Sequence, residues 1–330
     1  MAQLPPLGVY FLANDHVLPW VRSFVRSFRQ HNPDLPLCLI PFNDNCAGTR
    51  RIVQEAGGTV LELPETFARL EQIGAALELG HTATGRHWFR RFAAFEGGFE
   101  RFLYLDTRIV VLSDLRFFAL APQTYDVDLV HYDVAIEQVY QPGPIRRDFV
   151  RAGRGQGFIS NIWATRRGLF TMEQMERAGR ELVAVRSQMN PRNTDQFFLN
   201  YLCDANQAST VHLADLTGEL AHTCWAADCR KIYRDADQRW RVWDFGHLSH
   251  RRVVPLVHWA GLKLSPSMPH YSLFKTFQKA RVSGLERIAD AIRGLPGRCL
   301  YALRSNRHLN TLYHSLFGTR TDAIRTPDAL

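Results

Sequence analysis

The stretch RFLYLDTRIVVLSDL, residues 101–115, holds two apolar runs of strand length that are separated by Asp106, Thr107 and Arg108. Short apolar runs of this kind are typical of strands buried on both faces of a sheet. A carboxylate between them needs a partner or a cation, because a buried unpaired charge is costly. Two interpretations are open. Asp106 pairs with Arg108 or caps a turn, or it serves a ligand at the end of the strand.

The chain before this stretch alternates strands with helices. Apolar runs at Leu7–Ala13, Leu37–Phe42 and Thr59–Leu63 predict strands, and the segments between them have helical spacing. Such an opening is typical of a largely parallel sheet with helices on both faces. Further strands are expected at Val127–Tyr132, Phe158–Ala164 and Val254–Trp259, and further helices at Glu65–Leu79, Arg86–Phe95, Met172–Arg186 and Thr194–Leu202.

The composition is that of a globular protein. The 330 residues are 46% hydrophobic, which excludes disordered, collagen-like and disulfide-scaffold classes. The start of the chain does not resemble a signal peptide, and no apolar run reaches the ~20 residues of a membrane span. The six cysteines form no C-x-x-C pair, and Cys224, Cys229 and nearby His222 lack the second ligand pair that structural zinc sites normally show. We therefore expect reduced, buried thiols in a cytoplasmic protein.

The positive charge is concentrated near the end of the chain. Residues 274–330 contain ten Lys/Arg and four Asp/Glu, so they carry +6 of the formal net charge of +8. Apolar side chains recur there at helical spacing, which predicts a domain over 1–265 and a basic amphipathic helical tail over 266–330. The tail could bind an anionic membrane at its inner face or pack back onto the body. It has no recognised nucleic-acid-binding motif, so nucleic acid is not an expected partner.

Polar residues follow several predicted strands directly. In open α/β sheets ligands bind beyond the carboxyl ends of the strands, where Asn14, Asp15, Asp44 and Asp106 are expected. The chain has no G-x-G-x-x-G motif between a strand and a helix and no Walker loop. These absences argue against the usual dinucleotide and P-loop sites.

Residues 101–115 resemble the D-x-D region of GT-A-fold glycosyltransferases, especially the retaining, glycogenin- and galactosyltransferase-like group. The flanks match, including Leu105, Val110 and the Ser-Asp-Leu end, but Arg108 stands where the second acidic residue is expected. The resemblance implies a GT-A-like α/β fold with a mixed, mostly parallel sheet flanked by helices and a C-terminal helical appendage.

Further segments resemble landmarks of that group in the same order, so the resemblance covers about residues 7–265. They are the helix with Arg90 and Arg91, which would help hold the sugar donor, the segment 157–164 with Asn161, the Asp195-Gln196 helix with Asn200, and residues 258–263 with Gly261 and Lys263. The last is similar to an H-x-x-G-x-x-K motif, with one residue fewer between glycine and lysine.

The resemblance implies transfer from a nucleoside-diphosphate sugar, with a UDP-sugar favoured, to a saccharide or a lipid-linked acceptor. Asp195 and Gln196 would face the anomeric region of the donor. Asp44 and Asn14 would face the nucleoside, and Asp15 is placed in the same donor-binding set.

The metal site of that group is only half present. Members usually bind a divalent cation, Mn²⁺ or Mg²⁺, through both acidic residues and the late histidine, and Asp106 and His258 could supply two of these ligands. Two outcomes are open. The Arg108 guanidinium replaces the metal and grips the diphosphate directly, or the domain is a catalytically silent binding or scaffold protein.

Structural roles are open for several of these residues. Asp195 and Gln196 could simply begin a helix that Thr194 caps. His258 lies in an apolar run and could be a hydrogen-bonded core histidine. The loop tryptophans are more often core than platforms for a sugar, and Ser160 has no identifiable base, so a hydrolase triad is not supported.

Overall fold

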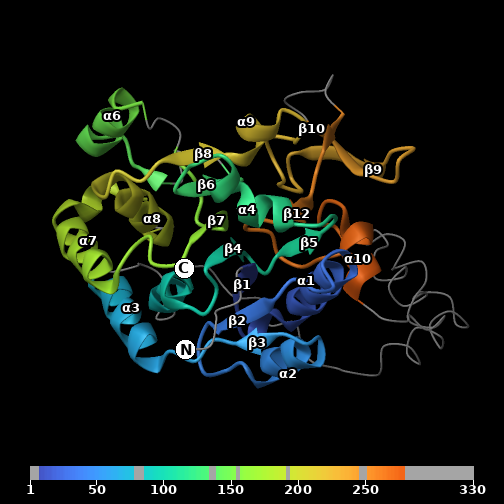
Figure 1. Ribbon diagram of the computed structural model, residues 1–330, viewed down its shortest axis with the longest axis horizontal. Helices are drawn as coiled ribbons and strands as arrows, with labels where there is room; N and C mark the ends of the chain where they lie inside the picture. Colours follow the sequence, from blue (N-terminus) through green and yellow to red (C-terminus); the bar gives the residue numbers. More distant parts are fainter. Residues whose placement is uncertain are drawn as a thin grey trace, which may run out of the picture.

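A seven-stranded sheet runs through the middle of the computed structural model, which describes residues 7–77, 85–133, 139–153, 157–190, 194–244 and 251–278 (Figure 1). The strands are ordered β3-β2-β1-β4-β7-β6-β8. β7 is antiparallel to both of its neighbours, and every other pair is parallel. The predicted mixed, mostly parallel sheet is therefore confirmed. The bounds are β1 Leu7–Ala13, β2 Leu37–Pro41, β3 Thr59–Val60, β4 Arg101–Leu105, β6 Leu129–His131, β7 Ile162–Arg166 and β8 Thr210–His212.

Alternation along the central strands builds two cores, one on each face of the sheet. Val9 and Phe11 of β1 face one core, whereas Tyr10 and Leu12 face the other. Both faces are buried, which is why the strands read as continuous apolar runs. The first face is covered by α1 (Leu18–His31), α2 (Ala47–Glu55), α4 (Arg116–Thr124) and α10 (Tyr271–Gln278); the second by α3 (Pro64–Ala76), the 3₁₀ helix η2 (Gly85–Glu96), α7 (Met172–Val185) and α8 (Thr194–Ala205).

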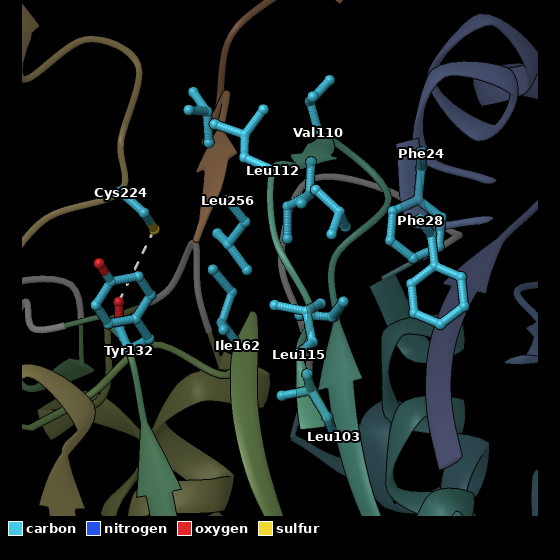
Figure 2. Close-up of a cluster of buried hydrophobic side chains, with 14 of the residues drawn as sticks. Phe24, Phe28, Leu103, Val110, Leu112, Leu115, Tyr132, Ile162, Cys224 and Leu256 are labelled. Carbon is cyan, nitrogen blue, oxygen red and sulfur yellow. Dashed lines mark hydrogen bonds between the residues drawn. The ribbon is translucent and has the colours of Figure 1, made fainter. Parts of the chain in front are cut away.

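Smaller elements complete the first face. β5 (Ile109–Val111) and β12 (Leu256–His258) form a two-stranded antiparallel sheet, and Figure 2 shows Val110 and Leu256 within the core that these strands share with α1 and β4. β9 (Cys229–Arg234), β10 (Trp240–Asp244) and β11 (Arg252–Val253) form a separate three-stranded sheet. The remaining helices of the described ranges are η1 (Asp15–Val17), α6 (Pro144–Arg151), η3 (Arg186–Gln188) and α9 (Leu213–Thr217).

Some predicted elements differ in type or length. The helix expected over 86–95 is the 3₁₀ helix η2, and its fully buried Phe89, Phe92 and Phe95 explain why: a three-residue period places all three on one face. The strand expected over 59–63 is only two residues long, because Pro64 begins α3. The strand expected over 158–164 begins later, at Ile162, because Ser160 and Asn161 form a turn before it.

The first part of the predicted tail packs against the body. The ring of Phe274, on α10, lies 4.7 Å from that of Trp20 on α1, and Ser23 Oγ donates to the Phe274 carbonyl at 3.4 Å. The tail helices expected near 285–292 and 309–317 lie outside the described residues. Within the described ranges, no helix combines the length and apolar character needed to cross a bilayer. The five cysteines of these ranges are all buried and unlinked, as expected, and Cys299 lies outside them.

Candidate active site

The ends of several strands bring the predicted polar residues to one edge of the sheet. Asn14 follows β1 and Asp106 follows β4, both at carboxyl ends, and Asp133, which was not predicted, comes shortly after the carboxyl end of β6. Because β7 runs in the opposite direction, its beginning lies at this same edge. The Asp106 N–H accordingly donates to the Asn161 carbonyl at 2.8 Å. The reversed strand therefore adds residues to the site that a parallel strand would place at the far edge.

A cavity of ≈ 470 Å³ opens at this edge. Its size is that of a small-molecule binding site. Most of the predicted site residues line it, namely Asn14, Arg91, Asp106, Arg108, Asn161, Asp195, Gln196 and Gly261. Aromatic side chains also line it: Phe42, Trp88, Tyr104 and Trp225.

Asp106 is held in a turn at the edge of this cavity. One carboxylate oxygen, Oδ1, accepts the Arg108 N–H at 2.8 Å, so the turn that was one of the two interpretations does form. The Arg108 guanidinium instead donates to the Leu262 carbonyl at 3.4 Å. Burial would raise the pKa of Asp106, but His258, the Arg108 N–H and the positive charges of Arg108 and Arg91 outweigh it and lower the pKa. Asp106 is therefore an anion facing a cavity.

A buried ion pair joins η2 to α8 beneath the cavity. Arg91 Nη1 lies 3.0 Å from Asp195 Oδ2, and both side chains are almost fully buried. Ser160 links them, because its hydroxyl donates to Asp195 at 2.6 Å and accepts from Arg91 at 2.8 Å. Asp195 is therefore more than the beginning of a helix. Ser160, for which the sequence indicated no role, positions this pair.

Gln196 contributes to the cavity a polar atom that has no hydrogen-bond partner among the described residues. Its side chain is 7% exposed and lines the cavity, and Oε1 has no hydrogen-bond partner among the described residues. By contrast, Asn200, one turn later on α8, uses its side chain fully: Nδ2 donates to the carbonyls of Gln196 and Phe158, and Oδ1 accepts the Phe158 N–H. A buried amide oxygen without a hydrogen-bond partner is costly, and nearly all buried polar groups have one. A ligand that donates to Gln196 Oε1 would explain this exception.

The other predicted donor-binding residues lie outside this cavity. Asp15 holds the beginning of α2, accepting the Gly48 and Thr49 N–H groups at 2.9 and 2.8 Å. Arg90 pairs with Glu71 and donates to the Pro41 carbonyl at 3.2 Å. Asp44 is exposed on the loop after β2. Of the two arginines proposed on η2, the structure thus places only Arg91 in the cavity.

Lys263 lines a second cavity, of ≈ 400 Å³, beside the first. The two cavities share Val17, Arg108 and Gly261, and the second adds His16 and Lys263. Arg108 therefore stands at the junction, and the second cavity is rich in basic side chains.

The residues around Asp106 offer few protein ligands to a divalent cation of the Mg²⁺ or Mn²⁺ type. Mg²⁺ is usually held by one or two carboxylates together with substrate phosphates and water. The lining of the first cavity offers two carboxylates, and one of these, Asp195, is already paired with Arg91. His258 is 1% exposed, does not line the cavity, and has its Nδ1 3.7 Å from Asp133 Oδ2. Candidate metal ligands gather elsewhere, at Asp133, Cys224 and His258 and at His212, Asp215 and His222.

The aromatic part of the site was largely missed from the sequence. Trp88 lies three residues before Arg91, and the three-residue period of η2 places both on the cavity. The three-residue spacing of Trp88 and Arg91 places them on one face only if the helix is known to be a 3₁₀ helix. Of the tryptophans, Trp225 lines the cavity, whereas Trp259 is a core residue whose Nε1 donates to the Pro269 carbonyl at 2.7 Å.

No family model and no curated protein matches the sequence. Solved structures do match the fold. The galactosyltransferase LgtC in complex with donor and acceptor sugar analogs is 13% identical, with a TM-score of 0.50 over 85% of this chain and 99% of LgtC. An active-site mutant of LgtC is 14% identical, with a TM-score of 0.52 and the same coverage of both chains. The bifunctional glycosyltransferase WbbM is 12% identical, with a TM-score of 0.52 over 88% of this chain. This chain spans about half (52%) of WbbM. The chain thus has the fold of GT-A glycosyltransferases, as residues 101–115 predicted.

Proposed function

We propose that the protein transfers a sugar from a nucleoside-diphosphate sugar to a saccharide or a lipid-linked acceptor. The observation that carries this proposal is the cavity at the carboxyl edge of the sheet. It combines the Arg108 guanidinium with a carboxylate, Asp106, and the unpartnered amide oxygen of Gln196. A sugar nucleotide presents the matching groups: negative charge on the diphosphate and hydroxyl donors on the sugar.

The nucleoside is assigned to the part of the cavity beside β1 and β2. Phe42, directly after β2, offers a ring on which a base can stack, and Asn14 lies next to it. Asn14 is fixed by two hydrogen bonds, to Asn43 Oδ1 at 3.2 Å and from the His16 N–H at 3.1 Å. We favour a pyrimidine base, since ≈ 470 Å³ must also hold the sugar, and among pyrimidine nucleotides we favour UDP, as the resemblance implies.

The diphosphate is assigned to Arg108, at the junction of the two cavities, with Lys263 and His16 on its far side. A guanidinium can bind two phosphate oxygens at once, and its charge does not depend on pH. As the bond between the sugar and the diphosphate breaks, negative charge grows on the phosphate oxygens. A fixed cation there stabilises the departing group, which is the role a metal would otherwise fill.

The sugar is assigned to Gln196 and Asp195, at the start of α8. Arg91 and Ser160 hold Asp195 in place, so this carboxylate can act without moving. Gln196 Oε1 can accept a sugar hydroxyl, since no described residue donates to it. Trp225, which also lines the cavity, offers an apolar surface for the acceptor.

Thermal-shift measurements with UDP, GDP and CDP, each with EDTA or with Mn²⁺, test the binding step. We expect stabilisation by UDP that persists in EDTA. Incubation with a panel of sugar nucleotides then tests turnover, read as release of the nucleoside diphosphate. Stabilisation without turnover for any donor or acceptor would identify a silent binding protein. No shift with any nucleotide would refute the proposal.

A further inference from the structure

A second cluster of chemically reactive side chains lies deeper in the protein, apart from the cavity. Asp133 comes from the segment after β6, Cys224 from the loop that carries Trp225, and His258 from the end of β12. They are 3%, 0% and 1% exposed, and none of them lines the cavity. One oxygen, one sulfur and one nitrogen of these side chains all lie within 4.8 Å of one another.

The main chain fixes the three segments relative to one another. The His258 N–H donates to the Cys224 carbonyl at 2.8 Å, and the Ala226 N–H donates back to the His258 carbonyl at 2.8 Å. Cys224 Sγ lies 3.9 Å from the carbonyl of Tyr132, the residue before Asp133, as Figure 2 shows. The cluster is therefore built into the core and not formed by mobile surface side chains.

Two atoms of the cluster have no hydrogen-bond partner within the described part of the chain. Asp133 Oδ2 and His258 Nδ1 are both fully buried and form no hydrogen bond, and at 3.7 Å they are an ion pair only when the imidazole is protonated. This separation is too long for a hydrogen bond. It is close to the distance of roughly 3.4 Å between two ligands on a tetrahedral ion with bonds of about 2.0–2.2 Å. Two buried polar atoms that face each other without a hydrogen bond are the arrangement expected where an ion binds between them.

We propose that Asp133, Cys224 and His258 bind one zinc ion. A carboxylate, a thiolate and a neutral imidazole balance the 2+ charge, so the bound ion would leave no net charge in this dry region. The thiolate favours zinc over Mg²⁺ or Mn²⁺, which prefer oxygen ligands. On binding, the thiol proton passes to solvent and an S–Zn bond forms.

The ion would join two segments that border the cavity to the segment after β6. Trp225 follows Cys224, Ala260 and Gly261 follow His258 closely, and all three line the cavity wall. We therefore expect zinc to stabilise that wall and not to contact the sugar nucleotide. The proposal does not depend on the proposed function, since nothing in it requires a donor to bind.

A second group, His212, Asp215 and His222, does not offer the same chemistry. His212 Nδ1 accepts the Ala214 N–H at 3.2 Å, so the neutral ring carries its proton on Nε2, and that atom cannot bind a metal without losing it. Asp215 and His222 are both exposed, and exposed groups of this kind are common without an ion.

The test uses the full-length chain, stripped with a chelator and titrated with Co²⁺ as a spectroscopic substitute for zinc. We expect one ion per chain and the near-ultraviolet charge-transfer absorption of a cobalt–thiolate bond. This absorption should be absent in Cys224→Ser and retained in Cys203→Ser, a matched control because Cys203 is another buried thiol, on α8. Failure to see the band in the wild type, or its persistence in Cys224→Ser, would overturn the proposal.

Competition by zinc measures the other two ligands. Asp133→Asn and His258→Gln should each weaken zinc binding by more than about 10-fold, which is the lower end of the cost of losing an outer-shell partner. Zinc should also raise the melting temperature of the wild type but not of Cys224→Ser. Wild-type zinc affinity in both the Asp133 and His258 variants would refute the assignment of these ligands. UDP binding, measured in parallel, tests the proposed function separately.

Discussion

Arg91 and Asp195 form an ion pair of 3.0 Å between η2 and α8, with side chains that are 7% and 4% exposed. These residues are more than a hundred positions apart, and each depends on the other. Removal of one partner leaves the other as a largely buried charge without its counterion. Ser160 completes the arrangement by bonding to both.

Asp195→Asn should therefore destabilise the protein by about 3–5 kcal/mol, because the Arg91 charge is left buried and unpaired. Urea denaturation measures this free energy of unfolding. Asp148→Asn is the matched control, since it breaks an exposed pair with Arg151 that has a comparable distance of 3.2 Å, and it should cost less than about 1 kcal/mol. Equal effects of the two substitutions would contradict the assigned role of the buried pair.

Arg108→Asp should lower the affinity for UDP in EDTA by about 10- to 100-fold, the loss expected for a charged hydrogen-bonding partner. It places a second carboxylate two residues after Asp106, so Mn²⁺ should restore binding in this variant. Isothermal titration with and without Mn²⁺ gives both values. Arg22→Asp, which changes an exposed arginine away from both cavities, is the control. If the wild type itself requires Mn²⁺ to bind UDP, Arg108 does not take the place of a metal ion.

Gln196→Leu should separate activity from stability. The substitution removes a buried oxygen that has no partner among the described residues, so the melting temperature should stay the same or rise, while sugar transfer should fall by about 10²-fold. Asn200→Leu, on the same helix, should instead lower the melting temperature, because three hydrogen bonds are lost. Thermal denaturation and initial rates give the two readouts. A Gln196 variant as unstable as the Asn200 variant would show that the unpartnered oxygen is not a functional group.

Stability should fall on acidification through His212. Burial is the main cause that lowers its pKa to about 4, from 6.5 in the unfolded chain, and its Nδ1 must stay unprotonated to cap α9. Between these two values the unfolded state binds a proton that the folded state does not, so stability is lost as the pH falls. The loss at pH 5 should be about 1–2 kcal/mol.

His212→Asn removes the titration while keeping a side chain that can cap a helix. Urea denaturation at pH 7 and pH 5 should therefore show a smaller loss in this variant than in the wild type. His16→Asn, at an exposed histidine, is the control. A wild-type pH dependence in His212→Asn would assign the effect to other groups.

The sheet and many of the residues that line the cavity could be predicted from the sequence. Asp106 could be placed at a strand end from the two apolar runs around it, and Asp195, Gln196 and Arg91 from the order of the resembling segments. Arg90 and Asp15 could not be separated from true lining residues, because both are polar and adjacent to them in the chain. Their actual partners, Glu71 and the beginning of α2, come from elsewhere in the fold.

The buried cluster could not be predicted from the sequence. Asp133, Cys224 and His258 have no common spacing, and each lies in a stretch that reads as ordinary core. The sequence argued against a zinc site at Cys224, Cys229 and His222, and the structure instead gathers Cys224 with residues from β12 and the segment after β6. Only the pairing of β12 beside the Cys224 loop brings these side chains together.

The reversed strand β7 has a consequence for the order in which the chain folds. β7 lies between β4 and β6, yet it follows both in the sequence. During synthesis β1 to β4 can pair as they emerge, whereas β6 must wait for β7 and β8, its two neighbours in the sheet. Asp106 is thus in place early, and Asn161, Asp195 and Gln196 arrive with the later half. The nascent chain should therefore complete the proposed sugar-binding part of the cavity only after β7 has inserted and α8 has docked.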